Sequence, residues 1–269
     1  TVGVFYDAGD ELNTHLGKAY SQGARTANMS LGSISVTGYD ADAEEIDQFI
    51  YNKPDAMVYI AAGNDGQDND NDGIPDRPQS QVKSPANTKN SVVVGATFNA
   101  NAGEGRLPRF RVISSSVGPA VSTAIGRIVP HVMAPGADVT PQVSNPSLGL
   151  ESDFYCRTDD NDQEGEVLCD TVTGIEGTSF ASPAVAGAGA LVRDWFAQGF
   201  YPTGAADPLK EEDGISGALV KAVLIASADF VTGNVSDEEG SHRANMEQDW
   251  GRVQLDNALP LQTWPDSPL

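Results

Sequence analysis

Residues 177–183 read Gly-Thr-Ser-Phe-Ala-Ser-Pro, and an uninterrupted run of small and apolar residues follows at 184–192. Proline is tolerated in the first turn of a helix, so Pro183 predicts a helix that begins within a few residues of Ser179. Because the alanine and glycine run has no polar face, we expect this helix to be buried on all sides. Ser179 would then lie at the positive end of a helix dipole, where an oxyanion is stabilised. The alternative is that Ser179 is only a helix N-cap.

The other apolar segments alternate between helix and strand patterns. Helical spacing predicts helices at residues 11–23, 40–52 and 216–227. Apolar runs predict buried strands at residues 57–62 and 91–96, and strands are also predicted at residues 2–6 and 24–31. Residues 248–253 resemble a short closing strand. Buried strands that alternate with helices indicate an α/β fold, a mostly parallel sheet between two helical layers (α/β/α). With no internal repeat or linker, residues 1–269 are expected to form a single domain.

Ligands of such sheets bind beyond the carboxyl ends of the strands. The strand predicted at 24–31 ends at Gly32, and the strand at 57–62 is followed by Gly63 and Asn64. We therefore expect Gly32, Asn64 and the loop before Ser179 to meet at one edge of the sheet.

The composition excludes some classes of function. The chain has 269 residues, 39% of them hydrophobic, which supports a sizeable core. Its net charge of −22 argues against nucleic-acid binding, because the chain would repel phosphates. Such an excess of acidic residues is typical of a solvated surface suited to salty or calcium-rich media. The chain contains no run of 18 or more apolar residues, so the sequence predicts no membrane span. The chain begins at Thr1 without a visible signal peptide, so we expect a processed piece whose targeting segment lies elsewhere.

The two cysteines flank an acidic loop. Cys156 and Cys169 lie on either side of residues 157–168, and a disulfide between them would close this loop. Such a disulfide implies an oxidising setting, and we expect a secreted, extracellular protein. The alternative is two unrelated free thiols; without a paired Cys/His set they are a poor zinc site.

Residues 68–76 read Asp-Asn-Asp-Asn-Asp-Gly-Ile-Pro-Asp. Carboxylates at alternate positions, with a glycine directly after the third, allow the loop to curl round one Ca²⁺. The predicted ligands are Asp68, Asp70, Asp72, the carbonyl of Ile74 and Asp76. Gln79 stands where an EF-hand has a glutamate, so the loop is similar to shorter calcium loops. The alternative is a solvated acidic loop, which is our interpretation of residues 159–166.

Several segments, in the expected order, resemble landmarks of the subtilisin-like serine proteases, or subtilases. Residues 177–183 resemble the nucleophile motif, and Ala61-Ala62-Gly63-Asn64 resembles the oxyanion motif, whose Asn side chain donates to the developing charge. Residues 28–32 resemble the strand that pairs with the substrate backbone. Further resemblances, at residues 84–96, 113–119 and 132–136, include the strand pair that lines the first specificity pocket.

The resemblance implies a subtilisin-like fold and a serine endopeptidase that acts on a peptide or protein substrate. Ser179 would be the nucleophile, and the Asn64 side chain and the Ser179 N–H would form the oxyanion hole. The implied substrate-binding residues are Ser30, Leu31, Gly32, Ala61, Ala62 and Gly63.

The chain departs from the family at the other two catalytic residues. Subtilases use Asp, His and Ser in that chain order. The Asp and His motifs should precede residue 28, and the chain begins too late to hold either. None of His15, His131 and His242 has the family's sequence context. Because a serine needs a base to become a good nucleophile, we expect the chain alone to be nearly inactive. The Asp and His would come from an N-terminal fragment, which is either cleaved but associated or absent.

Two other functions stay open. The first is a non-catalytic subtilase-like module that binds peptides or acts as a calcium-stabilised scaffold. The second is an esterase or amidase that uses Ser179 with another base, which would leave the peptide-pairing strand without a role.

Overall fold

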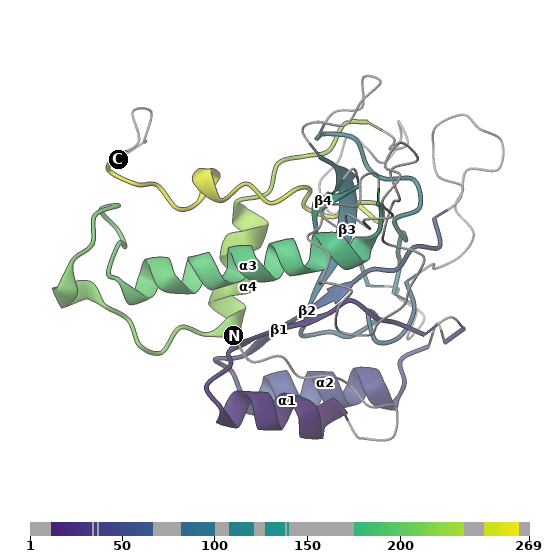
Figure 1. Ribbon diagram of the computed structural model, residues 1–269, viewed down its shortest axis with the longest axis horizontal. Helices are drawn as coiled ribbons and strands as arrows, with labels where there is room; N and C mark the ends of the chain where they lie inside the picture. Colours follow the sequence, from purple (N-terminus) through teal and green to yellow (C-terminus); the bar gives the residue numbers. More distant parts are fainter. Residues whose placement is uncertain are drawn as a thin grey trace, which may run out of the picture.

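The computed structural model describes residues 12–33, 35–36, 38–66, 82–99, 108–120, 127–137, 139, 175–233 and 245–263. In chain order, the elements are helix α1 (Leu12–Ser21), strand β1 (Thr26–Met29), helix α2 (Ala41–Asn52) and strands β2 (Met57–Ala61), β3 (Val92–Phe98) and β4 (Val132–Ala137). They are followed by helix α3 (Thr178–Ala197), the short 3₁₀ helix η2 (Pro208–Lys210), helix α4 (Gly217–Ala226) and the 3₁₀ helix η3 (Leu255–Asn257) (Figure 1).

The four strands form one sheet in the order β1-β2-β3-β4, and every neighbouring pair is parallel. Thr26 pairs with Met57, Tyr59 with Val92, and Val94 with Val132. The strands β2 and β3 are buried at every residue, which explains why their sequences are continuously apolar. Since all four strands run the same way, their carboxyl ends meet at one edge of the sheet.

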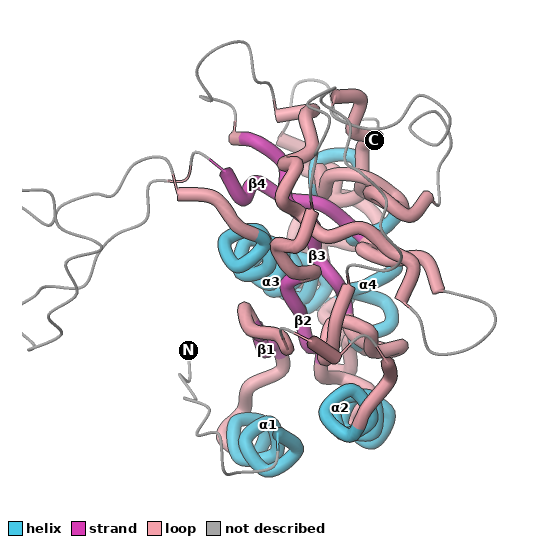
Figure 2. Tube along the Cα trace, turned by 90° about the vertical axis from the view of Figure 1, so that its right-hand side faces the viewer, coloured by secondary structure: helices cyan, strands magenta, loops and turns pink. Residues whose placement is uncertain are grey.

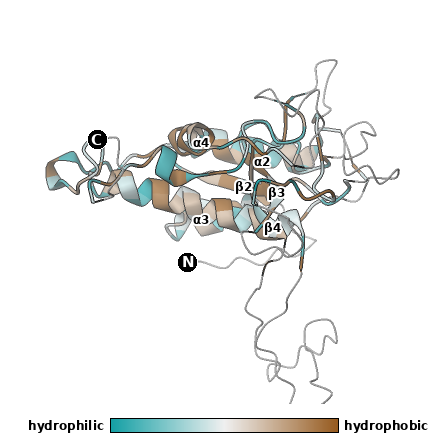
Figure 3. Cartoon of the chain, turned by 90° about the horizontal axis from the view of Figure 1, so that it is seen from above, coloured by the Kyte–Doolittle hydropathy of each residue, from teal (hydrophilic) through white to brown (hydrophobic). Residues whose placement is uncertain are grey.

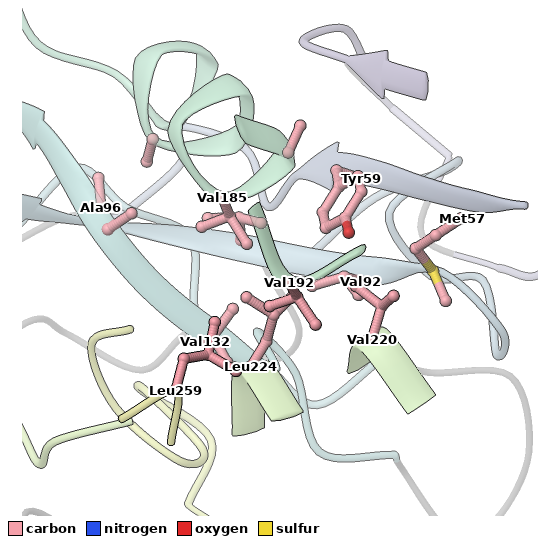
Figure 4. Packing of buried hydrophobic residues seen from close by; sticks show 14 of the residues in the cluster. Met57, Tyr59, Val92, Ala96, Val132, Val185, Val192, Val220, Leu224 and Leu259 are labelled. Carbon is pink, nitrogen blue, oxygen red and sulfur yellow. The ribbon is translucent and has the colours of Figure 1, made fainter. Parts of the chain in front are cut away.

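Two hydrophobic clusters lie on opposite faces of the sheet. One joins it to α3 and α4 and includes Tyr59, Val92, Val94, Val132, Val185, Val192 and Leu224 (Figure 4). The other joins it to α1 and α2 and includes Leu12, Leu16, Ile46, Phe49, Val58, Ile60 and Val93. Successive residues of β2 therefore face different layers. Figure 2 shows α1 and α2 together at the bottom of this view, with α3 and α4 beside the strands above them. The predicted three-layer α/β/α architecture is confirmed.

Capping side chains set the starts of two helices. The Asp40 carboxylate accepts a hydrogen bond from Ala43 N, and α2 begins directly after it. The Ser216 hydroxyl does the same for Leu219 N at the start of α4. Both residues are among the preferred N-caps, so these boundaries agree with the sequence to within a residue. Figure 3 shows hydrophobic colouring over much of α4 and β2.

The prediction that α3 is buried on all sides is wrong. Its sheet-facing residues Val185 and Val192 are buried, but Ala184, Gly187 and Leu191 are exposed, and 60% of Leu191 is accessible. The sheet and α4 cover one side of the helix. Within the ranges described above, no segment covers the other side, so small apolar residues face outward there.

Two predictions about strands need correction. Residues 248–253 form no strand; instead, Arg252 makes single bridges to Met133 and to Asp229. Residues 132–137 form the edge strand β4, whereas the sequence of residues 132–136 indicated only a resemblance to a family motif. The strand predicted at residues 2–6 lies outside the described residues. In the described part of the chain, no helix is long and apolar enough to span a membrane.

Candidate active site

A pocket of about 270 Å³ lies at the carboxyl edge of the sheet, between the segments that follow β1 and β2 and the start of α3. All the residues assigned from the sequence to the nucleophile, the oxyanion hole and the substrate backbone line it: Ser30, Leu31, Gly32, Ala61, Ala62, Gly63, Asn64 and Ser179. The remaining lining residues are Ser33, Asp65, Lys83, Ala86 and Thr178. The fold thus brings together segments that lie about 150 residues apart in sequence, as the Ser30–Ser179 separation of 149 shows.

Ser179 is the second residue of α3, and its side chain is partly exposed toward the pocket. Gly177, not Ser179, occupies the N-cap position, so the interpretation of Ser179 as a mere helix cap is wrong. The N–H of Gly177 donates to the carbonyl of Gly136 at 2.7 Å, which fixes the loop to the end of β4. Among the described residues, no acceptor takes the N–H of Ser179. This donor therefore adds to the positive potential at the start of a 20-residue helix.

Polar side chains join the end of β1 to the first turns of α3. Pro183 has no N–H, so the carbonyl of Ser179 lacks the helical donor that it would otherwise have. Ser30 Oγ instead donates a hydrogen bond of 2.8 Å to this carbonyl, and it accepts one of 3.0 Å from Asn28 Nδ2. Asn28 Oδ1 in turn accepts from Ser182 Oγ at 2.7 Å. This network holds the main chain of Ser179 against the segment that the sequence predicts to pair with substrate.

The orientation of the Asn64 amide is set by Thr178. The main-chain N–H of Thr178 donates to Asn64 Oδ1 at 2.9 Å, and its hydroxyl donates to the same oxygen at 3.0 Å. The Thr178 hydroxyl also accepts from Gly63 N at 3.2 Å. With Oδ1 occupied by two donors, Nδ2 is the group of this half-exposed amide that is left to donate to a ligand. No described residue accepts from it.

The Subtilase family model matches residues 8–251. The chain belongs to the subtilase family. Two curated relatives from Dictyostelium discoideum are the serine protease/ABC transporter B family proteins tagD and tagB, which are 24% and 26% identical to it. The alignments cover 91% and 93% of this chain but only 17% and 16% of the relatives, so the chain spans about a sixth of their length.

Solved structures of proteases share the fold of this subtilase chain. The prenylagaramide maturation protease PagA has a TM-score of 0.54 at 22% identity, over 96% of this chain and 71% of its own. The S41 psychrophilic protease also has a TM-score of 0.54, at 19% identity, over 90% of this chain and 61% of its own. The family and the subtilisin-like fold predicted from the sequence are confirmed.

His131 lies at the opposite end of the sheet from Ser179. It precedes β4, its Nδ1 accepts a hydrogen bond from Val93 N at 2.9 Å, and its Nε2 lies 3.2 Å from Lys221 Nζ. Burial lowers the pKa of His131 well below its usual value, and the charges of Lys221 and Arg127 lower it further. His131 therefore stays neutral, and because its ring lies at the far end of the sheet, outside the pocket, it cannot serve as the base of Ser179.

Of the other two histidines of this subtilase chain, the one that the structure describes provides no base at the pocket. His15 lies on α1, which belongs to the helical layer on the opposite face of the sheet from α3. His242 lies outside the described residues. Ser179 Oγ donates a weak hydrogen bond of 3.5 Å to the carbonyl of Ser30. Within the described part of the chain, no histidine or carboxylate hydrogen-bonds to this hydroxyl.

Three residues of the sequence motifs have a supporting role that the sequence did not predict. Thr178, Asn28 and Ser182 support the pocket through the hydrogen bonds described above. Their hydroxyl and amide groups lie close in sequence to Ser179 or Ser30, and this was the signal that could have pointed to them. Lys83 and Asp65 are a different case, because nothing in the sequence marked them as neighbours. Lys83 Nζ and Asp65 Oδ1 lie 2.9 Å apart at the pocket.

The remaining predicted sites lie outside the described residues. These are the calcium ligands Asp68, Asp70, Asp72, Ile74 and Asp76, and the cysteines Cys156 and Cys169. Calcium binding and the disulfide stay predictions from the sequence.

Proposed function

We propose that this chain is the serine-bearing part of a serine endopeptidase, with Ser179 as the nucleophile. The observation that carries the proposal is that Ser179, Asn64 and residues 30–32 line one pocket. Ser179 Oγ would attack the carbonyl carbon of the scissile peptide bond as a base removes its proton. The amine would then leave with a proton, and water would hydrolyse the resulting acyl ester.

Asn64 and the main chain of Ser179 would stabilise the oxyanion. The two donors of Thr178 occupy Asn64 Oδ1, which supports a role for Nδ2 as the donor to the developing charge. The Ser179 N–H, at the start of α3, would be the second donor. Donors that are already oriented cost no reorganisation during the reaction, and each contributes about 10²–10³ in turnover.

Residues 30–32 would bind the substrate backbone. They continue directly from β1, the edge strand of the described sheet, where an extended peptide can add main-chain hydrogen bonds. A peptide on this segment would pass beside Ser179 Oγ, which hydrogen-bonds weakly to the carbonyl of Ser30 at 3.5 Å.

The base would come from an N-terminal fragment that carries the Asp and the His. Two features support a docking place for it. One side of β1 has no strand partner among the described residues, and α3 exposes Ala184, Gly187 and Leu191, although it packs against β1. An open strand edge and an exposed apolar helix face both favour covering by further protein. Without the fragment, turnover would fall by about 10⁶, the value measured for removal of the histidine in subtilisin itself.

The second candidate function is a non-catalytic peptide-binding or scaffold module. The observation that favours it is that no described histidine or carboxylate contacts Ser179 Oγ. For either function we propose a secreted, extracellular protein, stabilised by Ca²⁺ at residues 68–76 and by a Cys156–Cys169 disulfide. The acidic composition and the spacing of these residues support that part of the proposal.

Peptide hydrolysis by the complete protein, including any sequence that flanks this chain, tests the endopeptidase. We expect Ser179→Ala to abolish turnover, and Asn64→Ala to lower kcat by about 10²–10³ with little change in KM. Asn52→Ala, at the exposed end of α2, is the matched control. Turnover that survives Ser179→Ala would contradict the proposal, and a wild-type protein that binds peptide without hydrolysing it would establish the scaffold function instead.

A further inference from the structure

One ion pair lies in the wall of the pocket that contains Ser179 and Asn64. Lys83 Nζ and Asp65 Oδ1 are 2.9 Å apart, and both residues line the pocket. They are the only charged residues among the described residues of the lining. The lining also includes Ala61, Ala62 and Ala86, whose side chains take up little space. The pocket therefore has room for a long side chain that ends near a charge.

The main chain on both sides of the ion pair is held in place. Next to Lys83, the N–H of Ser84 donates to the carbonyl of Val36 at 2.8 Å, and its hydroxyl donates to Asp40 Oδ1 at 2.5 Å. The N–H of Asp65 donates to Ser116 Oγ at 3.1 Å. The two charges thus project from fixed positions of the pocket wall.

The two partners differ in how far they reach into solvent. The Asp65 side chain is 45% exposed, whereas that of Lys83 is only 19% exposed. An ion pair this open contributes little to stability, so it can be exchanged at small cost. Asp65 can turn into water and remain solvated, while Lys83 stays at the pocket. The ammonium has three donors, and Asp65 is its acceptor in the described part of the chain. A second carboxylate could therefore join it.

The family resemblance implies that this pocket holds the side chain of the substrate residue on the acyl side of the scissile bond. We propose that Lys83 makes the pocket select an acidic side chain at that residue. Asp65 moderates the selection because it competes for the same ammonium. The inference deepens the proposed function and rests on it, since the substrate carbonyl must lie at Ser179 for its side chain to enter this pocket.

The electrostatic field of the whole molecule cannot produce a preference for an acidic side chain. With 38 acidic and 16 basic residues, the protein repels an acidic peptide at long range. A preference for glutamate over glutamine must then come from a local contact, and it must disappear when the Lys83 charge is removed.

Binding of three labelled peptides tests the proposal. The peptides differ only in the last residue, Glu, Gln or Lys, followed by a C-terminal amide, and fluorescence polarisation gives Kd for the complete protein in the Ser179→Ala background. We expect the Glu peptide to bind about tenfold more tightly than the Gln peptide, as is usual for a hydrogen bond to a charged group. Lys83→Met should make the two affinities equal, Lys83→Arg should preserve the difference, and Asp65→Asn should increase it.

Lys18→Met, an exposed lysine on α1, is the control for the loss of one positive charge, and thermal melts verify folding of each variant. Three outcomes would overturn the specificity proposal but leave peptide binding standing. They are equal affinity of the parent protein for the Glu and Gln peptides, tighter binding of the Lys peptide, and a preference for the Glu peptide that survives Lys83→Met. If none of the three peptides binds, the proposed peptide site fails, and the specificity with it.

Discussion

Ser30 Oγ donates a hydrogen bond of 2.8 Å to the main-chain carbonyl of Ser179, across 149 residues of sequence. In a regular helix this carbonyl would accept from the N–H of residue 183, but Pro183 has none. The Ser-Pro pair in the first turns of α3 thus creates an open acceptor, and the segment after β1 closes it. The segment proposed to bind peptide and the helix that carries the proposed nucleophile are therefore linked by a direct hydrogen bond.

Ser30→Ala should lower the free energy of unfolding by about 1 kcal/mol, because the Ser179 carbonyl loses its donor. In a Pro183→Ala background, the restored N–H of residue 183 satisfies this carbonyl, so the cost of Ser30→Ala should shrink markedly. Urea denaturation of the four proteins of this double-mutant cycle measures the coupling. Ser35→Ala, at an exposed position, is the control. Strictly additive effects would show that the carbonyl does not depend on Ser30.

Two glycines of α3 give a matched pair for the packing of this helix. A Cβ at Gly189 would lie 1.8 Å from Tyr59 Oη and 2.7 Å from its Cζ, whereas a Cβ at Gly187 meets nothing within 4 Å. Gly189→Ala should therefore destabilise the protein by about 1–3 kcal/mol through overpacking. Gly187→Ala should stabilise it by up to about 1 kcal/mol, because alanine is the better helix former. Chemical denaturation compares them, and equal stabilities would contradict the packing of α3 on β2.

The carboxyl of Asp249 should make the free energy of unfolding depend on pH. Burial raises its pKa to about 7, although Lys221 acts in the opposite direction. Between about pH 4 and pH 7, the unfolded chain has lost this proton while the folded chain retains it, so the free energy of unfolding falls as pH rises. Asp249→Asn removes this slope, and asparagine tolerates the left-handed φ of 46°.

The variant's stability relative to wild type should therefore increase from pH 4.5 to pH 7.5, as measured by urea denaturation at both values. Asp213→Asn, at an exposed position, is the control. A difference between wild type and Asp249→Asn that is the same at both pH values would show that the Asp249 carboxyl is not perturbed by burial.

Calcium removal tests the proposed ion site at residues 68–76. If Ca²⁺ binds there in about hundredfold excess over its Kd, EDTA should lower the melting temperature by about 5 °C or more. Added Ca²⁺ should restore it, whereas Asp70→Asn should show little response to either. An unchanged melting temperature in EDTA would remove the calcium proposal.

The sequence predicted those parts of the fold that depend on local patterns. The apolar runs at 57–62 and 91–96 overlap with β2 and β3, and the capping residues Asp40 and Ser216 mark the starts of α2 and α4. The strand β4 was missed because Pro135 and Gly136 argue against a strand interior. Proline is tolerated there because β4 lies at the edge of the described sheet and the register with β3 shifts at this point.

The lining of the site was predicted better than the contacts that organise it. Family motifs pointed to Ser179, Asn64 and residues 30–32, because each motif follows a strand or opens a helix at the same edge of the sheet. The hydrogen bonds of Thr178 to Asn64 and the Lys83–Asp65 ion pair join different loops, and no local pattern reports such contacts. The exposed face of α3 was missed for a related reason: a sequence shows that a helix lacks polar residues, but not which segments cover it.

Intact-mass spectrometry of the native protein, before and after treatment with a fluorophosphonate probe, tests the central claim most directly. Such a probe modifies a serine only when a base activates its hydroxyl. We predict an adduct on Ser179 together with a second, co-purifying polypeptide that carries the Asp and the His. A single polypeptide without an adduct would contradict the endopeptidase and leave the non-catalytic module as the function of this chain.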